Sequence, residues 1–99
     1  MKNIYSNIIN PNSKNLNKVI KILKKDGIIS LPTETVYGLA GNAYSNTSIK
    51  KIFNVKKRVK KNPLIIHYYS LNEAKKDVVL NKNFYKVYKK FSPGPLTYI

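Results

Sequence analysis

The chain contains no cysteine and no tryptophan, and His67 is its single histidine among 99 residues. Disulfide bonds and thiolate metal sites are therefore excluded, and one histidine cannot build a zinc site alone. Long apolar segments are also missing, since no run approaches the roughly 18 apolar residues that a membrane span needs. The first residues lack the apolar run of a signal peptide. We therefore expect a cytoplasmic protein without membrane contact.

Acidic residues are scarce as well. Four Asp and Glu stand against 19 Lys and Arg, which gives a net charge of +15. Such a charge attracts phosphate-bearing partners, nucleotides or RNA, so a basic RNA-binding module is one interpretation. AT-rich codon usage also inflates lysine without selection for binding, and scattered lysines on solvated faces need no ligand. Only the cluster at residues 56–61, with five cations in six positions, calls for a specific explanation.

We expect residues 1–99 to form a single domain. The spacing of its apolar residues predicts helices. Apolar side chains three and four residues apart predict a helix over about residues 13–25, which Gly27 is placed to end. A second helix follows potential N-caps at residues 45–48 and runs into the basic cluster. A short helix is expected from Leu71. A further helix spans the apolar positions between Phe84 and Phe91, and the Ser-Pro-Gly-Pro segment at 92–95 ends it.

Three short apolar runs predict strands. Residues 28–31 form a strand that Pro32 stops, because proline has no N–H for the ladder. Residues 64–69 are apolar, β-branched and aromatic, and residues 96–99 open another strand. Alternating helices and strands predict an α/β or α+β fold, a twisted mixed sheet flanked by helices. Ligands gather at loops that leave strand ends in such sheets.

The most distinctive segment is Leu31–Gly41, where Pro, Thr, Glu and Gly interrupt a background of Lys, Asn, Ile and Tyr. It follows a predicted strand. Thr35 offers a hydroxyl that can donate or accept, and His67 can bind a carboxylate or hydroxyl of a small substrate, although a lone histidine is often structural. Glu34 could orient a neighbour or help hold a metal. It could equally be a helix-entry carboxylate with Thr33 as the N-cap.

The basic cluster suggests phosphate chemistry. Neither a Walker loop nor a Rossmann glycine pattern occurs. Lys56 and Arg58 could neutralise a polyphosphate, and the guanidinium supplies paired donors that lysine cannot copy. The alternative is a solvated basic helix end that the helix dipole favours. No nucleophilic triad or carboxylate pair stands out, so the residues favour positioning and charge neutralisation, as in phosphoryl or nucleotidyl transfer.

Four motifs together resemble the YrdC-like family of threonylcarbamoyl-AMP synthases. They are Pro-Thr-Glu-Thr-Val-Tyr-Gly-Leu at 32–39, Lys-Lys-Arg at 56–58, Asn-Pro-Leu-Ile-Ile-His at 62–67 and Pro-Gly-Pro-Leu-Thr at 93–97. The resemblance runs from about Asn12 to the last residue. It implies a YrdC-like fold, of which this chain resembles the N-terminal half: the second half of the family domain, with a Ser-x-Asn motif, has no counterpart. We therefore expect a fragment or a degraded copy with weak or no activity.

The resemblance also implies a reaction. L-Threonine and bicarbonate form a carbamate that attacks the α-phosphate of ATP, which yields threonylcarbamoyl-AMP and pyrophosphate. Mg²⁺ is expected on the phosphates, and no metal site made of protein side chains. Thr35 and His67 match threonine-binding positions; Lys56 and Arg58 match the pair that faces the phosphates and are the implied catalytic residues; Asn62 matches a further ATP contact.

The product of that reaction feeds the threonylcarbamoyl modification of adenosine 37 in tRNA. The implied partners are therefore the tRNA threonylcarbamoyl-transfer machinery and tRNA or double-stranded RNA. Two alternatives stay open. One is a YrdC-like segment of a carbamoyltransferase that matures hydrogenases, and the other is the non-catalytic RNA-binding module.

Overall fold

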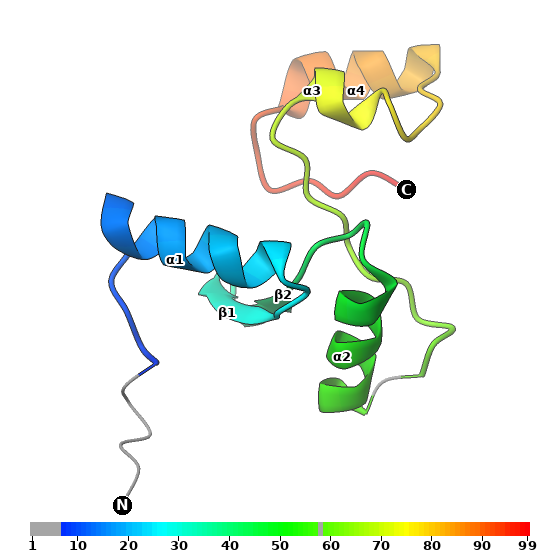
Figure 1. The fold of residues 1–99 in the computed structure, drawn as a ribbon. Coiled ribbons are helices and arrows are strands. Elements are labelled where there is room, and N and C mark those ends of the chain that lie inside the picture. Colours follow the sequence, from blue (N-terminus) through cyan, green and yellow to red (C-terminus); the bar gives the residue numbers. More distant parts are fainter. Residues whose placement is uncertain (1–6, 58) are drawn as a thin grey trace, which may run out of the picture. The chain divides into compact units, whose positions relative to one another are not determined.

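The computed structural model describes residues 7–57 and 59–99, which form two compact units. The first unit ends at Asn62 and the second spans Pro63–Ile99. The first holds α1 (Ser13–Lys24), β1 (Ile29–Pro32), β2 (Tyr37–Ala40) and α2 (Asn46–Lys56), and the second holds α3 (Leu71–Ala74) and α4 (Lys82–Phe91) (Figure 1). Helices with a small sheet confirm the α+β class predicted from the sequence.

Local signals define α1 at both ends. The Asn12 side chain accepts a hydrogen bond from the N–H of Asn15 at 2.9 Å, which satisfies one of the free donors of the first turn. At the C-terminus the N–H of Gly27 donates to the Ile22 carbonyl at 2.9 Å, and that of Asp26 donates to the Leu23 carbonyl at 3.3 Å. This is a Schellman closure, in which Asp26, with φ of 61°, occupies the left-handed position. The predicted helix is confirmed.

Gly27 serves this closure by its small size and not by its dihedral angles. A Cβ at Gly27 would lie 2.5 Å from Cγ2 and 2.8 Å from the carbonyl oxygen of Ile22. The chain therefore passes close under the last turn of α1 and leads directly into β1, against which α1 packs.

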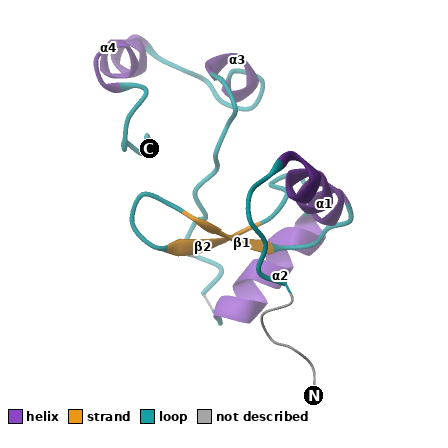
Figure 2. Ribbon diagram, turned by 90° about the vertical axis from the view of Figure 1, so that its left-hand side faces the viewer, coloured by secondary structure: helices purple, strands orange, loops and turns teal. Residues whose placement is uncertain are grey.

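β1 and β2 form an antiparallel hairpin, shown as orange arrows in Figure 2. Ile29 pairs with Ala40 at one end of the ladder and Pro32 pairs with Tyr37 at the other. The predicted strand 28–31 is thus confirmed with a shift of one residue, and β2 is a strand that the sequence did not predict. Among the described residues the sheet has these two strands only, so the expected mixed sheet is represented here by an antiparallel pair.

The core of the first unit lies where α2 meets the loop that follows β2. Among the described residues, Ile52 and Ser48 are the buried ones, and both belong to α2. A Cβ at Gly41 would lie 3.1 Å from Cβ of Ser48 and 3.5 Å from Cδ1 of Ile52. Small residues at 41 and 48 therefore let the helix approach the loop closely. The predicted helix after Ser45 is confirmed, with Ser45 as its N-cap.

The second unit begins with an irregular segment. Residues 64–69 form no strand, so that prediction was wrong, and His67 lies in this segment instead of at a strand end. The apolar, β-branched composition favours extended backbone, but a strand also needs a neighbour to complete its hydrogen bonds, and none of the described residues provides one. The strand predicted for residues 96–99 is absent for the same reason.

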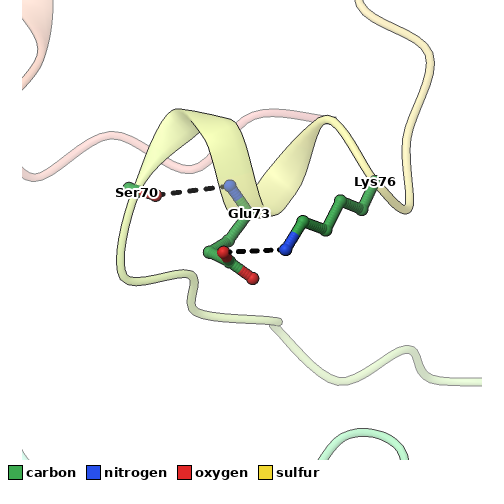
Figure 3. A network of polar contacts seen from close by, with 3 residues as sticks. All are labelled: Ser70, Glu73 and Lys76. Carbon is green, nitrogen blue, oxygen red and sulfur yellow. Dashed lines mark hydrogen bonds and ion pairs between the residues drawn. The ribbon is translucent and has the colours of Figure 1, made fainter.

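The short helix α3 confirms the prediction of a helix from Leu71. The hydroxyl of Ser70 accepts a hydrogen bond from the N–H of Glu73 at 3.3 Å, and the Glu73 carboxylate pairs with Nζ of Lys76 at 2.9 Å (Figure 3). Ser70 and Glu73 are the first and last residues of the Ser-x-x-Glu pattern that is typical of helix starts. The start of this single helical turn is therefore capped by Ser70, and an exposed Glu73–Lys76 ion pair lies at its end.

Aromatic side chains stabilise the region of α4. The ring of Phe84 lies 5.6 Å from that of Tyr88 and 4.8 Å from that of Tyr98, centroid to centroid. The Tyr98 hydroxyl also hydrogen-bonds the Ser92 hydroxyl. The last residues therefore fold back onto the helix through side chains and not through a strand. None of the helices in the described part of the chain is long and apolar enough to cross a membrane.

Candidate functional site

Thr35 lies in the turn between β1 and β2, within the distinctive segment. Residues 33–36 connect the two strands, and the N–H of Thr33 donates to the Val36 carbonyl at 3.2 Å, which closes the turn. The prediction that this segment follows a strand is confirmed. The alternative of a helix entered at Thr33 was wrong, because the chain here reverses into β2. Glu34 and Thr35 are both exposed at this reversal.

Thr33 is the hydrogen-bonding centre of the turn, a role that the sequence interpretation missed. Its Oγ1 accepts hydrogen bonds from the N–H of Thr35 at 3.3 Å and from the N–H of Val36 at 3.2 Å. The same hydroxyl bonds the Val36 carbonyl and lies 3.4 Å from Oγ1 of Thr35. Threonine hydroxyls often bond the backbone two or three residues ahead, and this tendency was the signal that could have identified Thr33.

Lys56 is the last residue of α2, and its side chain is exposed. Lys57 follows as the C-cap in the left-handed conformation, with φ of 50°, so the chain turns away from the helix axis at this residue. Arg58, the next candidate, lies outside the described residues. A cation in the last turn of a helix is favoured by the helix dipole, and an exposed one is free to meet an anion from solution.

Asn62 closes a turn at the end of the basic cluster. Its backbone N–H donates to the Val59 carbonyl at 3.0 Å, and its side chain is exposed. The turn therefore fixes the backbone of Asn62, while the side-chain amide keeps its donor and acceptor for a ligand. Lys56 and Asn62 thus belong to one short stretch of the first unit, at the end of α2 and just beyond it.

His67 belongs to the second unit and is exposed. Its neighbour Tyr68 donates a hydrogen bond to Oδ2 of Asp77 at 3.1 Å, which connects the irregular segment to the loop after α3. Desolvation raises the pKa of the Tyr68 hydroxyl above its usual 10.0, and the hydrogen bond to Asp77 and the negative charge of that carboxylate raise it further. The Tyr68–Asp77 bond is a second feature that sequence reasoning missed.

The structure therefore places four of the five predicted site residues. Thr35, Lys56 and Asn62 belong to the first unit and His67 to the second, and all four are exposed. No hydrogen bond or ion pair of the described residues joins two of them. Within residues 7–57 and 59–99, no three of the His, Asp and Glu side chains gather to form a metal site. Thr35, Lys56 and Asn62 offer hydroxyl, ammonium and amide groups to a ligand, and His67 offers an imidazole.

Comparisons with known proteins identify related sequences. A family model for the Sua5/YciO/YrdC domain, described as "Telomere recombination", matches residues 21–99. Proteins named "Threonylcarbamoyl-AMP synthase" from Pyrococcus abyssi and Bacillus subtilis are 40% and 32% identical over 78% and 92% of this chain. A protein of the same name from Psychromonas ingrahamii is 37% identical over 85% of the chain. No solved structure matches the chain.

The chain covers half or less of the length of each of these relatives. It covers 23% of the Pyrococcus protein, 27% of the Bacillus protein and 46% of the Psychromonas protein. A Methanocaldococcus jannaschii protein, 35% identical, aligns with 100% of this chain, which covers 50% of that relative. Half or more of each relative thus lies outside the region of similarity.

Proposed function

Because this chain belongs to the Sua5/YciO/YrdC family, we propose that it carries threonine-binding and nucleotide-binding residues of a threonylcarbamoyl-AMP synthase. The reaction joins L-threonine, bicarbonate and ATP into threonylcarbamoyl-AMP and releases pyrophosphate and water. The enzyme is a nucleotidyltransferase, since the AMP group of ATP moves to a carbamate oxygen. The region of family similarity covers about half of the M. jannaschii relative, so we propose weak or no turnover by the 99 residues alone.

One observation carries this proposal: the family match over residues 21–99 includes every residue singled out for its chemistry. These residues are Thr35, Lys56, Arg58, Asn62 and His67. The three relatives whose names are given above are named as threonylcarbamoyl-AMP synthases and not as carbamoyltransferases of hydrogenase maturation. The names of the relatives therefore favour the synthase over that alternative.

Lys56 and Arg58 would act on the phosphates of ATP. Pyrophosphate leaves as the carbamate attacks, and negative charge on the leaving group grows in the transition state. Fixed cations aimed at that charge lower the barrier, and loss of one such donor costs about 10² to 10³ in rate. Lys56 is exposed at the end of α2 and free to meet a phosphate. We assign Asn62 a supporting contact with ATP.

Thr35 and His67 would hold the amino acid. The Thr35 hydroxyl can donate to a carboxylate or accept from a hydroxyl, and the imidazole of His67 can do either according to its tautomer. Both side chains are exposed. In this proposal they orient the threonine carbamate, so that its oxygen faces the α-phosphate.

Magnesium would enter the site together with ATP. Mg²⁺ keeps several water ligands and binds through substrate phosphates with one or two carboxylates, and not in a cage of protein side chains. The donors of this site, hydroxyl, ammonium and amide groups, suit the phosphates better than the ion. Mg²⁺ would neutralise part of the phosphate charge, and the residues of this chain would position the reactants.

The product would serve the threonylcarbamoyl modification of adenosine 37 in tRNA. We infer a cytoplasmic site of action and transfer of the product to the machinery that completes the modification. A net charge of +15 suits a polyanionic partner such as tRNA. Salt-sensitive RNA binding without any ATP binding would instead favour the non-catalytic RNA-binding module.

The experiment that tests the function measures pyrophosphate release from ATP with and without L-threonine and bicarbonate. It compares the 99-residue chain with a chimera in which this chain replaces the matching half of the M. jannaschii relative. We expect release by the chimera only when both co-substrates are present, and weak or no release by the chain alone. A folded chimera that binds neither ATP nor threonine would overturn the proposal.

A further inference from the structure

The hydroxyl of Thr33 uses all of its hydrogen-bonding capacity inside the β1–β2 turn. A hydroxyl has one proton to donate and two lone pairs that accept. The N–H groups of Thr35 and Val36 donate to this oxygen at 3.3 Å and 3.2 Å, and its proton can go to the Val36 carbonyl. Thr33 therefore has no capacity left for a ligand, although it is exposed and stands in the most distinctive segment of the chain.

The Thr35 hydroxyl, in contrast, keeps hydrogen-bonding capacity for a ligand. Its Oγ1 makes a long hydrogen bond of 3.4 Å to Oγ1 of Thr33. Because the Thr33 proton can go to the Val36 carbonyl, Thr35 is the donor in this contact, and its two lone pairs remain to accept from a ligand. Two adjacent threonine hydroxyls thus have different tasks: one binds the backbone and the other faces solvent.

We propose that Thr33 is a positioning residue, which fixes the backbone of the turn so that Thr35 presents its hydroxyl to an α-amino acid. This inference rests on the proposed function, in which Thr35 contacts L-threonine. The hydrogen bonds to residues 35 and 36 hold the two N–H groups on either side of the Thr35 Cα and hence define where its side chain projects. Without them the turn samples other backbone angles, and the hydroxyl reaches the bound position in only a fraction of molecules.

Two substitutions distinguish the hydrogen bonds of the Thr33 hydroxyl from the packing of its methyl group. Thr33→Val keeps the branched shape of the side chain and removes the hydroxyl, whereas Thr33→Ser removes the methyl group and keeps the hydroxyl. Thr47→Val is the matched control, since Thr47 is an exposed threonine of α2 that lies outside the turn. The chain is ¹⁵N-labelled, and L-threonine and ATP are titrated separately. Amide hydrogen exchange is followed at residues 35 and 36.

We expect Thr33→Val to speed exchange at the two amides and to weaken L-threonine binding roughly fivefold, because the turn would then hold the binding conformation in about a fifth of the molecules. Thr33→Ser and Thr47→Val should stay within about twofold of the unsubstituted chain. ATP affinity should be the same in all variants. A residue that only stabilises the fold would change exchange without this selective loss of threonine affinity.

Four results would overturn the inference. The positioning role would be wrong if Thr33→Val bound L-threonine as tightly as the unsubstituted chain does. It would also be wrong if Thr33→Ser bound L-threonine as weakly as Thr33→Val. Both results would leave the proposed function intact. An equal loss of ATP and threonine affinity in Thr33→Val would assign the effect to general unfolding. An unsubstituted chain that binds ATP but no L-threonine would overturn the proposed role of Thr35 and this inference with it.

Discussion

The hydroxyl of Ser45 accepts a hydrogen bond from the backbone N–H of Ser48 at 3.1 Å, while the hydroxyl of Ser48 itself, fully buried, has no partner among the described residues. The two serines stand one turn apart at the start of α2. One satisfies a free donor of the helix, and the other introduces an unsatisfied polar atom into the core of the first unit. Replacement by alanine should therefore have opposite effects at the two positions.

Ser48→Ala should raise the free energy of unfolding by about 1 kcal/mol, because it removes a buried hydroxyl that lacks a hydrogen bond. Ser45→Ala should lower it by about 1 kcal/mol, because the N-cap is lost. Urea denaturation followed by circular dichroism measures both changes, and each variant is the control for the other. A loss of stability in Ser48→Ala would show that its hydroxyl has a partner in solution.

Gly27→Ala should lower the free energy of unfolding by about 1 to 3 kcal/mol, because the new methyl group would overlap the last turn of α1. Gly38→Ala is the control. Within the described part of the chain, a Cβ at Gly38 meets only Cγ2 of Thr33, at an ordinary 3.6 Å, so this change should be neutral or slightly stabilising. Equal urea midpoints for the two variants would contradict the close approach of Gly27 to Ile22.

Helices were predictable from the sequence because their signals are local. Asn12, Ser45 and Ser70 each cap the helix that follows, and the side-chain bonds involved join residues only three apart. Strands depend on partners elsewhere in the chain. Residues 64–69 have strand composition but no pairing neighbour among the described residues, while β2, with little alternation, pairs with β1 because a tight turn brings it there.

For the candidate site, residue types and motifs suggested the chemistry. The structure shows Thr35 in the β1–β2 turn, Lys56 at the end of α2 and Asn62 in the loop beyond it, all three exposed. The role of Thr33 depends on backbone geometry, since its hydroxyl reaches the amides of residues 35 and 36 only when the chain reverses. An alternative helix start at the same residue fitted the sequence equally well.

Lys56→Ala should weaken ATP binding roughly tenfold if Lys56 contacts phosphate, a loss typical of a charge-assisted hydrogen bond. Lys50→Ala is the matched control, because it removes the same charge from an exposed position in the same helix. If ATP is attracted only by the overall positive charge of the protein, both substitutions should lower ATP affinity equally. Isothermal titration at two salt concentrations distinguishes the outcomes, and equal losses would remove Lys56 from the site.

Arg58→Lys keeps the charge but loses the planar pair of donors. ATP–pyrophosphate exchange by the chimera should therefore fall by about 10² or more, since an ammonium group cannot replace two aimed N–H groups. Lys60→Arg is the control for a lysine–arginine exchange in the same cluster and should leave the rate nearly unchanged. Exchange by Arg58→Lys within about twofold of the unsubstituted chimera would exclude the proposed action of Arg58 on the phosphates of ATP.

Tyr68 should make the stability of the chain fall at high pH. Partial desolvation and the Asp77 carboxylate raise the pKa of its hydroxyl in the folded chain above 10.0, its ordinary value in the unfolded chain. The folded state then holds this proton more tightly, so the stabilisation is complete below pH 10.0 and is lost as the pH rises through the folded pKa. Tyr68→Phe should reduce the fall in urea midpoint between about pH 8 and about pH 11. Tyr69→Phe, which changes a neighbouring side chain that is 99% exposed, should not. If the two variants show the same dependence on pH, the Tyr68–Asp77 hydrogen bond does not persist in solution.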